Sequence, residues 1–247
     1  MLQNRIIPAL QIQDGSVVKS IKFKNHLYVG DPVNTVNIFN NMEVDEILII
    51  DIDTSNNIKY ELIEEIATEC FMPLTYGGGI ANTEQAKKIF GLGVEKIVIG
   101  ENSFNNFKFL NEISRIFGSQ SLVVSMDIKK SIFGKYSLKI KKNFFSINIS
   151  DYLKNLEVAG VGEILLTSVN NEGTYGGLDL DLISLASETV NIPIIAAGGV
   201  GSMEHIKDGR DAGASAIAIG SMAVFQNQNR SVLINFPKNS ERKKYGI

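Results

Sequence analysis

The chain has 247 residues, 44% of them hydrophobic, and a formal net charge of −3 at pH 7. That length and apolar content suffice for one domain with a continuous core. The weak net charge gives no indication of a nucleic-acid or anionic-membrane partner. The single cysteine, Cys70, excludes an internal disulfide and is typical of a reducing compartment. No apolar stretch approaches the roughly 18 residues of a membrane span, and no signal-peptide pattern is present, so a soluble cytoplasmic protein is expected.

Eight short runs rich in Ile, Val and Leu alternate along the chain with segments of helical periodicity. Such nearly continuous apolar runs are typical of parallel strands that helices cover on the outside. The predicted strands are 5–10, 46–51, 72–76, 96–100, 121–127, 163–168, 193–197 and 215–219. The predicted helices are 33–42, 60–69, 83–91, 106–117, 150–159, 179–189 and 203–212, and the longest irregular stretches are 14–32 and 129–149.

A long internal repeat relates the two halves of the sequence. Residues 73–104 align without a gap on residues 193–224, and each copy reads as a strand, a glycine-rich turn, a helix and a strand. Asn82 and Ser202 occupy the helix N-cap position in the two copies. The two copies are 120 residues apart, about half the chain, which is far longer than the roughly 20–50-residue period of a solenoid, so each copy belongs to one half of a fold. The repeat therefore predicts an α/β protein, a single (β/α)8 barrel built from two half-barrels.

No linker-like change of composition divides the chain, so one barrel domain is expected over residues 1–237. Residues 238–247 are polar and basic and are expected to form a short C-terminal tail that frays. Sites in (β/α)8 barrels form at the C-terminal ends of the strands. The residues that follow each predicted strand are therefore the candidates for function.

Glycines follow the seventh and eighth predicted strands. Gly198 and Gly199 follow one strand, and Gly220 and Ser221 follow the other. Glycines let backbone N–H groups approach phosphate oxygens, and a helix N-terminus adds a favourable dipole, so a phosphate site is predicted here. The alternative is that these glycines only form tight turns. In the first half Glu101 takes the place of Ser221, and its carboxylate would repel a phosphate unless it points away or binds a cation.

Acidic residues also end two of the strands. Asp127 ends the fifth predicted strand and is expected to project into the barrel mouth, where a carboxylate suits general acid–base catalysis. The alternative is a carboxylate that caps a loop or pairs with Lys129 or Lys130. Asp51 and Asp53 end the second strand in a similar way. Neither histidine has a cysteine pair or a second histidine at metal-binding spacing, so no metal and no cofactor are expected.

Charged residues of both signs begin four of the strands, at the opposite end of the barrel. Two cations and two anions would ring the floor, and buried charges need such partners. The alternative is that strand starts are simply polar and that some of these residues are solvated. A ring of this kind could plug the barrel or open to pass a small molecule. Its members are Arg5, Glu46, Lys96 and Glu163.

Over residues 1–236 the chain resembles the cyclase subunit of imidazole glycerol phosphate synthase. The resemblance is carried by RIIPALQIQDGSVVKSIKFKN, GDPV, YGGGI, FGSQSLVVSMD, AGVGEILLTS and PIIAAGGVGSMEH. It implies a barrel that binds a class I glutaminase subunit on its N-terminal face. Ammonia would travel through the barrel and react at the top with a substrate that has a phosphate at each end. The products would be imidazole glycerol phosphate and an aminoimidazole carboxamide ribotide.

The residues that the family uses transfer unevenly. The resemblance identifies the four floor residues as the ammonia gate, and Glu95 as the acidic residue near the glutaminase interface. Lys19 matches the flexible-loop lysine after the first strand, and Asp127 matches one of two catalytic aspartates. The other aspartate falls on Gln11, which cannot gain or lose a proton near neutral pH. The phosphate- and substrate-binding positions implied are Lys19, Gly79, Thr167, Gly173, Gly198, Gly199, Gly220 and Ser221.

Further departures from the family pattern cluster at the top of the barrel. An Asn-Thr phosphate pair after the fourth strand is replaced by Gly100 and Glu101. The aspartate before the glycine that follows the sixth strand is Glu172, and the serine before the glycines that follow the seventh strand is Ala197. The floor is therefore kept, while one acid and one phosphate site are changed.

This combination resembles the paralogous branch of the family found with surface-polysaccharide genes, in which segments like YVGDP, ECFMP and VLINFP also occur. The resemblance implies that barrel and glutaminase supply ammonia to a separate sugar amidotransferase. We interpret the chain as an ammonia conduit with an altered cyclase site. One alternative is a working cyclase of histidine biosynthesis, in which Asp127 acts alone or a water replaces the missing carboxylate. Another is an unrelated phosphosugar isomerase on the same barrel, because fold alone does not fix function.

Overall fold

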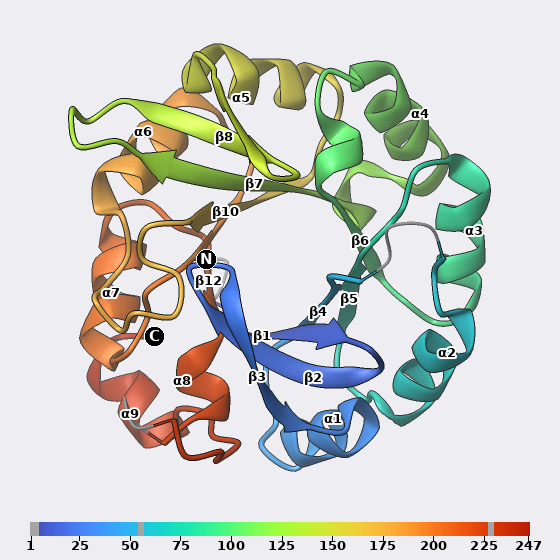
Figure 1. The fold of residues 1–247 in the computed structure, drawn as a ribbon, viewed down its shortest axis with the longest axis vertical. Helices are drawn as coiled ribbons and strands as arrows, with labels where there is room; N and C mark the ends of the chain where they lie inside the picture. Colours follow the sequence, from blue (N-terminus) through green and yellow to red (C-terminus); the bar gives the residue numbers. More distant parts are fainter. Residues whose placement is uncertain (1–4, 54–56, 227–229) are drawn as a thin grey trace.

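The computed structural model describes residues 5–53, 57–226 and 230–247, and it shows a closed barrel of eight parallel strands surrounded by helices (Figure 1). The strands follow one another around the barrel in chain order, and the pairing of β7 with β10 closes it. The predicted fold is confirmed, and each predicted strand overlaps an observed one. The barrel strands are β1 (Arg5–Gln13), β4 (Ile47–Asp51), β5 (Leu74–Gly77), β6 (Lys96–Ile99), β7 (Leu122–Lys130), β10 (Glu163–Ser168), β11 (Ile194–Ala197) and β12 (Ala216–Ile219).

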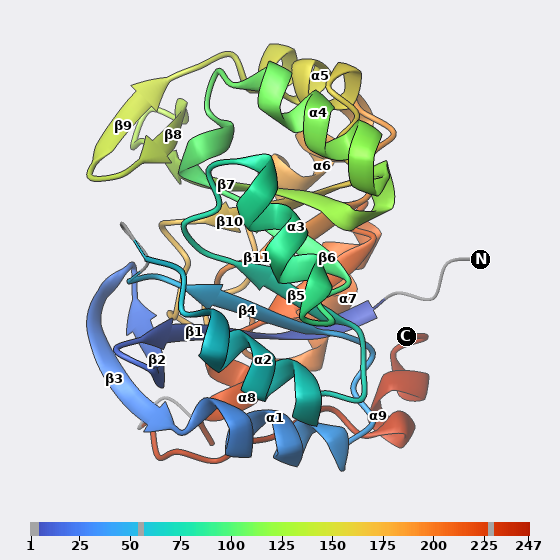
Figure 2. The same ribbon diagram turned by 90° about the vertical axis from the view of Figure 1, so that its right-hand side faces the viewer.

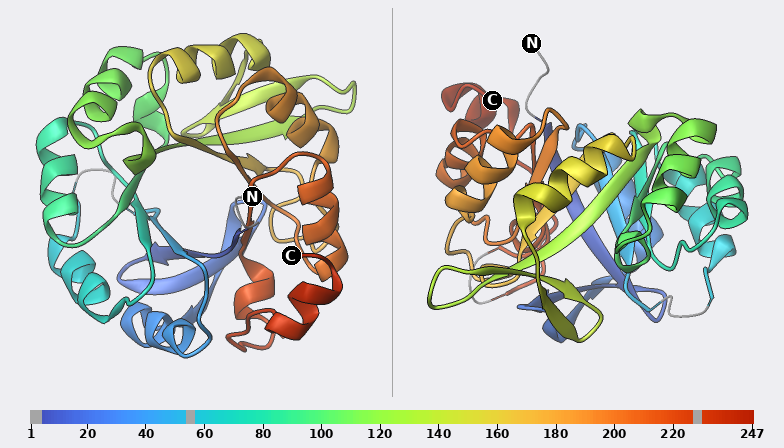
Figure 3. Two further views of the ribbon diagram at one scale, coloured as in Figure 1. Left: turned by 180° about the vertical axis from the view of Figure 1, so that it is seen from behind. Right: turned by 90° about the horizontal axis from the view of Figure 1, so that it is seen from above.

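Helices cover the outside of the barrel between successive strands, as both ends of the molecule show (Figures 1 and 3). Each of the predicted helices overlaps an observed one. Within the described residues no helix is both long enough and apolar enough to cross a membrane. The helices of this layer are α1 (Pro32–Asn40), α2 (Tyr60–Glu69), α3 (Thr83–Gly91), α4 (Phe107–Phe117), α5 (Ile149–Val158), α6 (Leu180–Thr189), α7 (Met203–Asp211) and the short α8 (Ser221–Val224).

The half-barrel repeat is present in the backbone as well as in the sequence. Asn82 precedes α3 with φ −153° and ψ 166°, and Ser202 precedes α7 with φ −154° and ψ 169°. Each side-chain oxygen accepts a hydrogen bond from the backbone N–H three residues later, so both are N-caps as predicted. The two copies therefore enter their helices with the same geometry.

Two apolar clusters stabilise the barrel, one between the strands and the helices and one inside the barrel. On β1, Ile7 and Ala9 pack inside, whereas Ile6 packs outside. Because side chains alternate between the faces of a strand, Arg5 and Gln11 also face the interior, at opposite ends of it. The buried members of the inner cluster are Ile7, Leu48, Val98, Val123, Leu165, Ile195, Ala216 and Ala218.

The two long segments predicted to be irregular contain antiparallel ribbons, so that prediction was wrong. One hairpin follows β1, and a second ribbon extends from β7. Both project from the end of the barrel where its strands finish (Figure 2). The ribbon strands are β2 (Ser16–Ile21), β3 (Lys24–Gly30), β8 (Tyr136–Ile140) and β9 (Asn143–Ser146).

The C-terminal segment, expected to fray, forms helix α9 (Asn239–Lys244) on the side where the barrel strands begin (Figure 2). Arg242 Nη2 lies 2.7 Å from Asp45 Oδ2. The same carboxylate oxygen accepts a hydrogen bond from the backbone N–H of Ile6 at 3.0 Å. Asp45 therefore connects α9 to the start of β1. Composition alone could not predict this contact, because its partners are 197 positions apart.

We expect Arg242→Ala to lower the free energy of unfolding by about 1.5–3 kcal/mol, because it leaves the partly buried Asp45 carboxylate without its cation. Urea unfolding followed by circular dichroism measures the change. Lys243→Ala, an exposed neighbour on the same helix, is the matched control and should alter stability by less than about 0.5 kcal/mol. Equal losses in the two variants would contradict this account of α9.

Candidate functional site

Four charged side chains meet at the floor of the barrel, as their positions predict. Arg5 Nη1 lies 2.6 Å from Glu46 Oε2, and Arg5 Nη2 lies 2.7 Å from Glu163 Oε1. Lys96 Nζ lies 3.0 Å from Glu46 Oε2 and 3.2 Å from Glu163 Oε2. Each cation therefore contacts both anions, and the ring is closed. None of the four is left solvated by itself.

The environment of this ring fixes its charges. Glu46 is buried, and its second carboxylate oxygen accepts a hydrogen bond from Thr75 Oγ1 at 2.7 Å. Burial lowers the pKa of Arg5, but Glu163 and Glu46 together outweigh burial, so the pKa of the guanidinium is raised. The apolar inner cluster lies directly above. The charged ring thus closes the end of the barrel where the strands begin. The interior above it is apolar and favours neutral molecules over ions.

Glu95, the residue expected near a partner, is exposed immediately before β6 at the same end of the barrel. Its backbone N–H donates to the Leu74 carbonyl at 3.0 Å, which holds this position against the neighbouring strand. Its role at an interface stays a prediction.

Asp127 lies near the top of β7, in an environment that disfavours its charge. Burial raises the pKa of its carboxyl to about 6. The positive charge of Lys139 opposes this shift, and the negative charges of Glu172 and Glu101 add to it. A hydrogen bond with Thr167 also favours the charged form. A carboxyl with this pKa can exchange a proton near neutral pH.

The two lysines that were an alternative explanation for Asp127 have other partners. Lys130 Nζ lies 2.8 Å from Asp181 Oδ2, and Lys129 Nζ lies 4.7 Å from the centre of the Phe144 ring. Asp127 is therefore not the ion-pair partner of either lysine, and its carboxyl remains a candidate acid or base.

We expect Asp127→Asn to raise the melting temperature by a few degrees at pH 8 and to leave it nearly unchanged at about pH 3. The ordinary pKa is 3.8 and the folded value is about 6. At about pH 3 the carboxyl is mostly protonated in both states, so the neutral amide has almost no advantage. The advantage grows between about pH 4 and pH 6 and is constant above that range. Calorimetry at about pH 3, 6 and 8 measures it, and a pH-independent difference would contradict the assigned environment.

Gln11 stands on the inner face of β1, at the end where Asp127 ends its own strand. Its register partner on β4 is Ile50, which also packs against the inner cluster. Gln11 Oε1 is 3.5 Å from Ser20 Oγ. Asp51 follows Ile50 and is buried, so by alternation it faces the outer side of the barrel. Asp51 therefore does not supply the carboxylate that Gln11 lacks.

Lys19 reaches from β2 into the glycine turn after β12. Its ammonium contacts the Glu172 carboxylate, and the two residues are only 4% and 7% exposed. A Cβ added to Gly220 would lie 2.6 Å from Lys19 Nζ, so the ammonium rests against this turn. A Cβ added to Gly173 would lie 2.4 Å from the Ser20 carbonyl oxygen, so the first hairpin packs closely on the loop after β10.

Polar groups without a partner gather beside this ion pair. Ser221 Oγ and Arg230 Nη1 are buried, and within the described residues neither has a hydrogen-bond partner. Arg230 Nη2 donates to the Gly173 carbonyl at 2.7 Å, and the Tyr175 hydroxyl donates to the Ser221 carbonyl at 3.2 Å. The free donors of Ser221 and Arg230 suit an anion, whereas the Lys19 ammonium is already paired with the Glu172 carboxylate. Arg230 could not be predicted from the sequence, because an arginine in a loop carries no motif.

Gly198 and Gly199 are required by packing alone. A Cβ on Gly198 would lie 2.7 Å from the Ser168 carbonyl oxygen, and a Cβ on Gly199 would lie 2.1 Å from that of Gly177. Both glycines have φ near +100°, the region that favours glycine. The tight-turn alternative therefore accounts for them, and their contact with a phosphate stays a prediction.

The corresponding corner of the first half is different. Glu101 begins a short 3-10 helix, Glu101–Ser103, and its Oε1 accepts a hydrogen bond from the Lys141 backbone N–H at 2.8 Å. Gly79 is exposed with φ +69°. The carboxylate is thus held by the turn between β8 and β9. A phosphate would meet its negative charge, as expected from the sequence.

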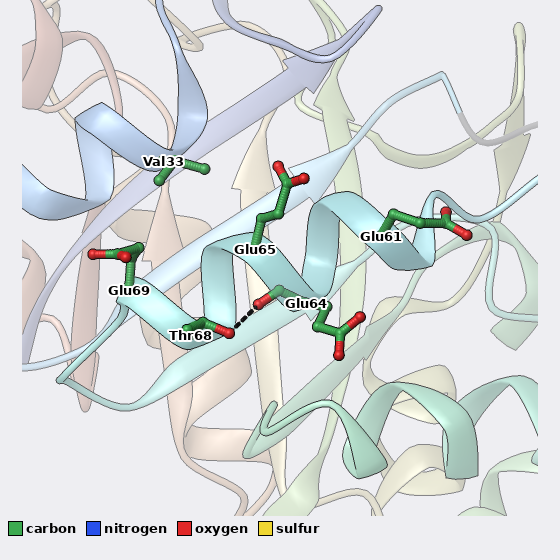
Figure 4. Close-up of a pocket in the computed structure, with 6 residues that line it drawn as sticks. All are labelled: Val33, Glu61, Glu64, Glu65, Thr68 and Glu69. Atoms are coloured by element: carbon green, nitrogen blue, oxygen red, sulfur yellow. Dashed lines mark hydrogen bonds between the residues drawn. The ribbon is translucent and has the colours of Figure 1, made fainter.

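An acidic groove lies on the outer surface between α1 and α2, away from all of these residues (Figure 4). No group of metal-ligating side chains able to hold an ion occurs within residues 5–53, 57–226 and 230–247. The groove is lined by Val33, Glu61, Glu64, Glu65, Thr68 and Glu69.

The barrel therefore has two unequal ends. The floor holds the complete charged ring of Arg5, Glu46, Lys96 and Glu163. The top brings together one titratable carboxyl, a corner with buried donors that have no partner within the described residues, and an amide where a second carboxyl was expected. This arrangement offers one acid–base group fewer than the resemblance implies.

Known proteins are similar to this chain along most of its length. A family model described as "Histidine biosynthesis protein" matches residues 5–229. The chain is 42% identical to "Putative imidazole glycerol phosphate synthase subunit hisF2" of Pseudomonas aeruginosa, over 96% of the chain and 97% of that protein. It is 40% identical to "Putative imidazole glycerol phosphate synthase subunit hisF3" of Vibrio vulnificus, over 99% of the chain and 96% of that protein. It is 36% identical to "Imidazole glycerol phosphate synthase subunit HisF" of Exiguobacterium sibiricum, over 90% of the chain and 91% of that protein.

Proposed function

Since the chain belongs to the histidine-biosynthesis family that includes the HisF subunits of imidazole glycerol phosphate synthase, we propose that it is a cyclase-like subunit that conducts ammonia to an acceptor outside its own barrel. A glutaminase docks on the floor and releases ammonia there. The acceptor reaction is the amidation of a surface-polysaccharide sugar by a separate amidotransferase, and the chain acts in the cytoplasm.

The complete ring at the floor supports the entry half of this proposal. A conduit needs an entrance that is closed at rest and that can rearrange when the glutaminase binds. The floor side chains contact one another at 2.6–3.2 Å and have the apolar inner cluster above them. Neutral ammonia can cross such an interior, whereas ammonium would lose its hydration there. In this role the ring is a gate, and Glu95 lies beside it.

Gln11 is the single observation that carries the exit half of the proposal. It faces the interior at the end where Asp127 lies, and Asp51, the next carboxylate along β4, faces away. Cyclisation by proton transfer between two positioned carboxyl groups is therefore not available in its usual form. Loss of one acid–base partner costs about 10²–10⁴-fold in rate. The Glu101 charge at the first-half corner disfavours the second phosphate of the cyclase substrate.

The experiment is to give the purified chain ammonium and the cyclase substrate. We expect turnover at least about 10²-fold below that of an ordinary cyclase, because one acid–base group is missing. Formation of imidazole glycerol phosphate, separated by chromatography, is the readout. Turnover within about tenfold of an ordinary cyclase would reject the conduit function in favour of histidine biosynthesis.

The second candidate function is that of a working cyclase, and the environment of Asp127 is the observation that favours it. A pKa of about 6 suits a group that both accepts and donates a proton near neutral pH. In that case a water held by Gln11 would replace the missing carboxylate. The pH profile of any residual turnover would then fall below about pH 6, as Asp127 is protonated.

A further inference from the structure

The antiparallel ribbons above the barrel mouth differ in charge from the rest of the chain. Residues 16–30 contain three lysines and residues 129–148 contain six, and neither segment contains aspartate or glutamate. The whole chain has 27 acidic and 24 basic residues, so the remainder is acidic. We call residues 16–30 and 129–148 the ribbon surface. Positive charge is thus concentrated at the end of the molecule where the barrel strands finish.

Exposed apolar side chains are concentrated on the same surface. Of the fifteen large hydrophobic residues found exposed in the described part of the chain, seven belong to it. Ile132 and Phe133, at the turn between β7 and β8, are 94% and 84% exposed. Side chains of this size, left in water beside lysines, are typical of a surface that another protein covers. The other five are Ile21, Leu27, Tyr28, Phe144 and Phe145.

The ribbon surface is continuous with the mouth of the barrel. Lys139 Nζ on β8 lies 4.9 Å from the centre of the Phe23 ring, which is at the turn between β2 and β3, so the two ribbons meet. The Phe145 ring lies 5.4 Å from that of Phe104, which follows β6. Lys139 also lies close enough to Asp127 to influence its carboxyl. A protein bound to the ribbons would therefore stand over the exit.

Several lysines of this surface are available to a partner. Lys19 and Lys130 already pair with Glu172 and Asp181. Six others are exposed and form no ion pair within the described residues, which leaves their charge for an external anion. These six are Lys22, Lys24, Lys129, Lys135, Lys141 and Lys142.

We propose that the ribbon surface is the docking site of the enzyme that consumes the ammonia, a protein whose facing surface is apolar at its centre and acidic at its rim. This inference rests on the proposed function. Ammonia that leaves the barrel into neutral water takes up a proton and stops being a nucleophile, so its acceptor has to cover the exit. The apolar side chains supply burial, and the lysines steer an acidic partner. The alternatives, a nucleic acid and an anionic lipid surface, would not consume ammonia.

The first experiment identifies the occupant. A photoreactive phenylalanine analogue replaces Tyr28, Phe133 or, as a control on the far side of α5, Lys154 in the full chain inside its own organism. The two ribbon positions are expected to crosslink to the same protein, which in pure form uses ammonium to form a C–N bond. Crosslinks only to lipid, to nucleic acid, to a second copy of the chain or to a protein without this activity would overturn the proposal, as would no crosslink.

The second experiment tests transfer in the complex of this chain, its glutaminase and the crosslinked enzyme. The triple variant Lys24→Glu, Lys135→Glu and Lys142→Glu is compared with a matched control on the outer helices, Lys87→Glu, Lys108→Glu and Lys154→Glu. We expect only the ribbon variant to lower glutamine-dependent product formation, by about tenfold or more. Its ammonium-dependent product formation and its glutamine hydrolysis should stay unchanged. Equal effects of the two triple variants would overturn the proposal.

The outcomes separate this inference from the proposed function. If glutamine nitrogen reaches the product equally well with wild type and with the ribbon variant, the conduit function stands and the docking surface is wrong. If wild-type complex transfers no nitrogen to an external acceptor, or if the chain cyclises its own substrate rapidly, the conduit function fails and the docking surface fails with it.

Discussion

The variant Gln11→Asp with Glu101→Thr is expected to have higher cyclase activity than the natural chain. The first change puts a titratable group on the inner face of β1, at the end where Asp127 lies. The second removes the negative charge from the first-half corner. A second acid–base group contributes about 10²–10⁴-fold. We expect a gain near the lower limit, about 10²-fold, because Glu172 and Ala197 still differ from the family pattern. Formation of imidazole glycerol phosphate from ammonium is the measurement.

The matched control is Gln11→Asn with the same Glu101→Thr. It changes the size of the side chain and keeps it unable to exchange a proton, so no gain is expected. An equal gain in both pairs would show that the Glu101 charge, not the missing acid, limits cyclisation. A folded double variant with no gain at all would remove Gln11 from its central place in this account.

Lys96→Ala is expected to uncouple glutamine hydrolysis from the amidation of the acceptor. In the intact ring, Glu46 and Glu163 each contact both cations. Without Lys96 both carboxylates keep Arg5 as their cation but lose the second one, and the opened side admits water in which ammonia is protonated and lost. We expect about ten times more glutamine hydrolysed for each amidated product, which corresponds to about 1.4 kcal/mol. Paired assays of glutamate and of amidated product give this ratio.

Lys87→Ala, on the exposed side of α3, is the control for this change and should leave the ratio at its wild-type value. Thermal unfolding should show that both variants keep their fold. An unchanged ratio in Lys96→Ala would count against a gate at the floor.

The barrel could be predicted from the sequence because its signals are local or repeated. The strands are short apolar runs, the caps Asn82 and Ser202 follow glycine turns, and the second half repeats the first at a fixed shift. The floor ring could be predicted in the same way, because four strands begin with a charge and the fold brings their starts together.

The hairpin between β1 and β2 could have been predicted, because Asp14 and Gly15 form its turn with φ values of 49° and 77°, and Asp-Gly is a usual signal for such a turn. The next turn lacks that signal: Lys22 and Phe23 adopt φ values of 49° and 61°, a conformation that hairpins normally give to glycine or asparagine. Contacts between distant residues were equally hidden. Lys19 and Glu172 are 153 positions apart, and nothing in the sequence around either residue indicates that the two form a buried ion pair.

The measurement that tests the central claim most directly compares two products in one tube. The complex of this chain with its glutaminase receives glutamine and the cyclase substrate, and glutamate and imidazole glycerol phosphate are quantified together. If the barrel conducts ammonia but has lost cyclisation, glutamate should be abundant. Imidazole glycerol phosphate should then amount to less than about 1/10² of the glutamate. Equal amounts of the two would contradict that claim.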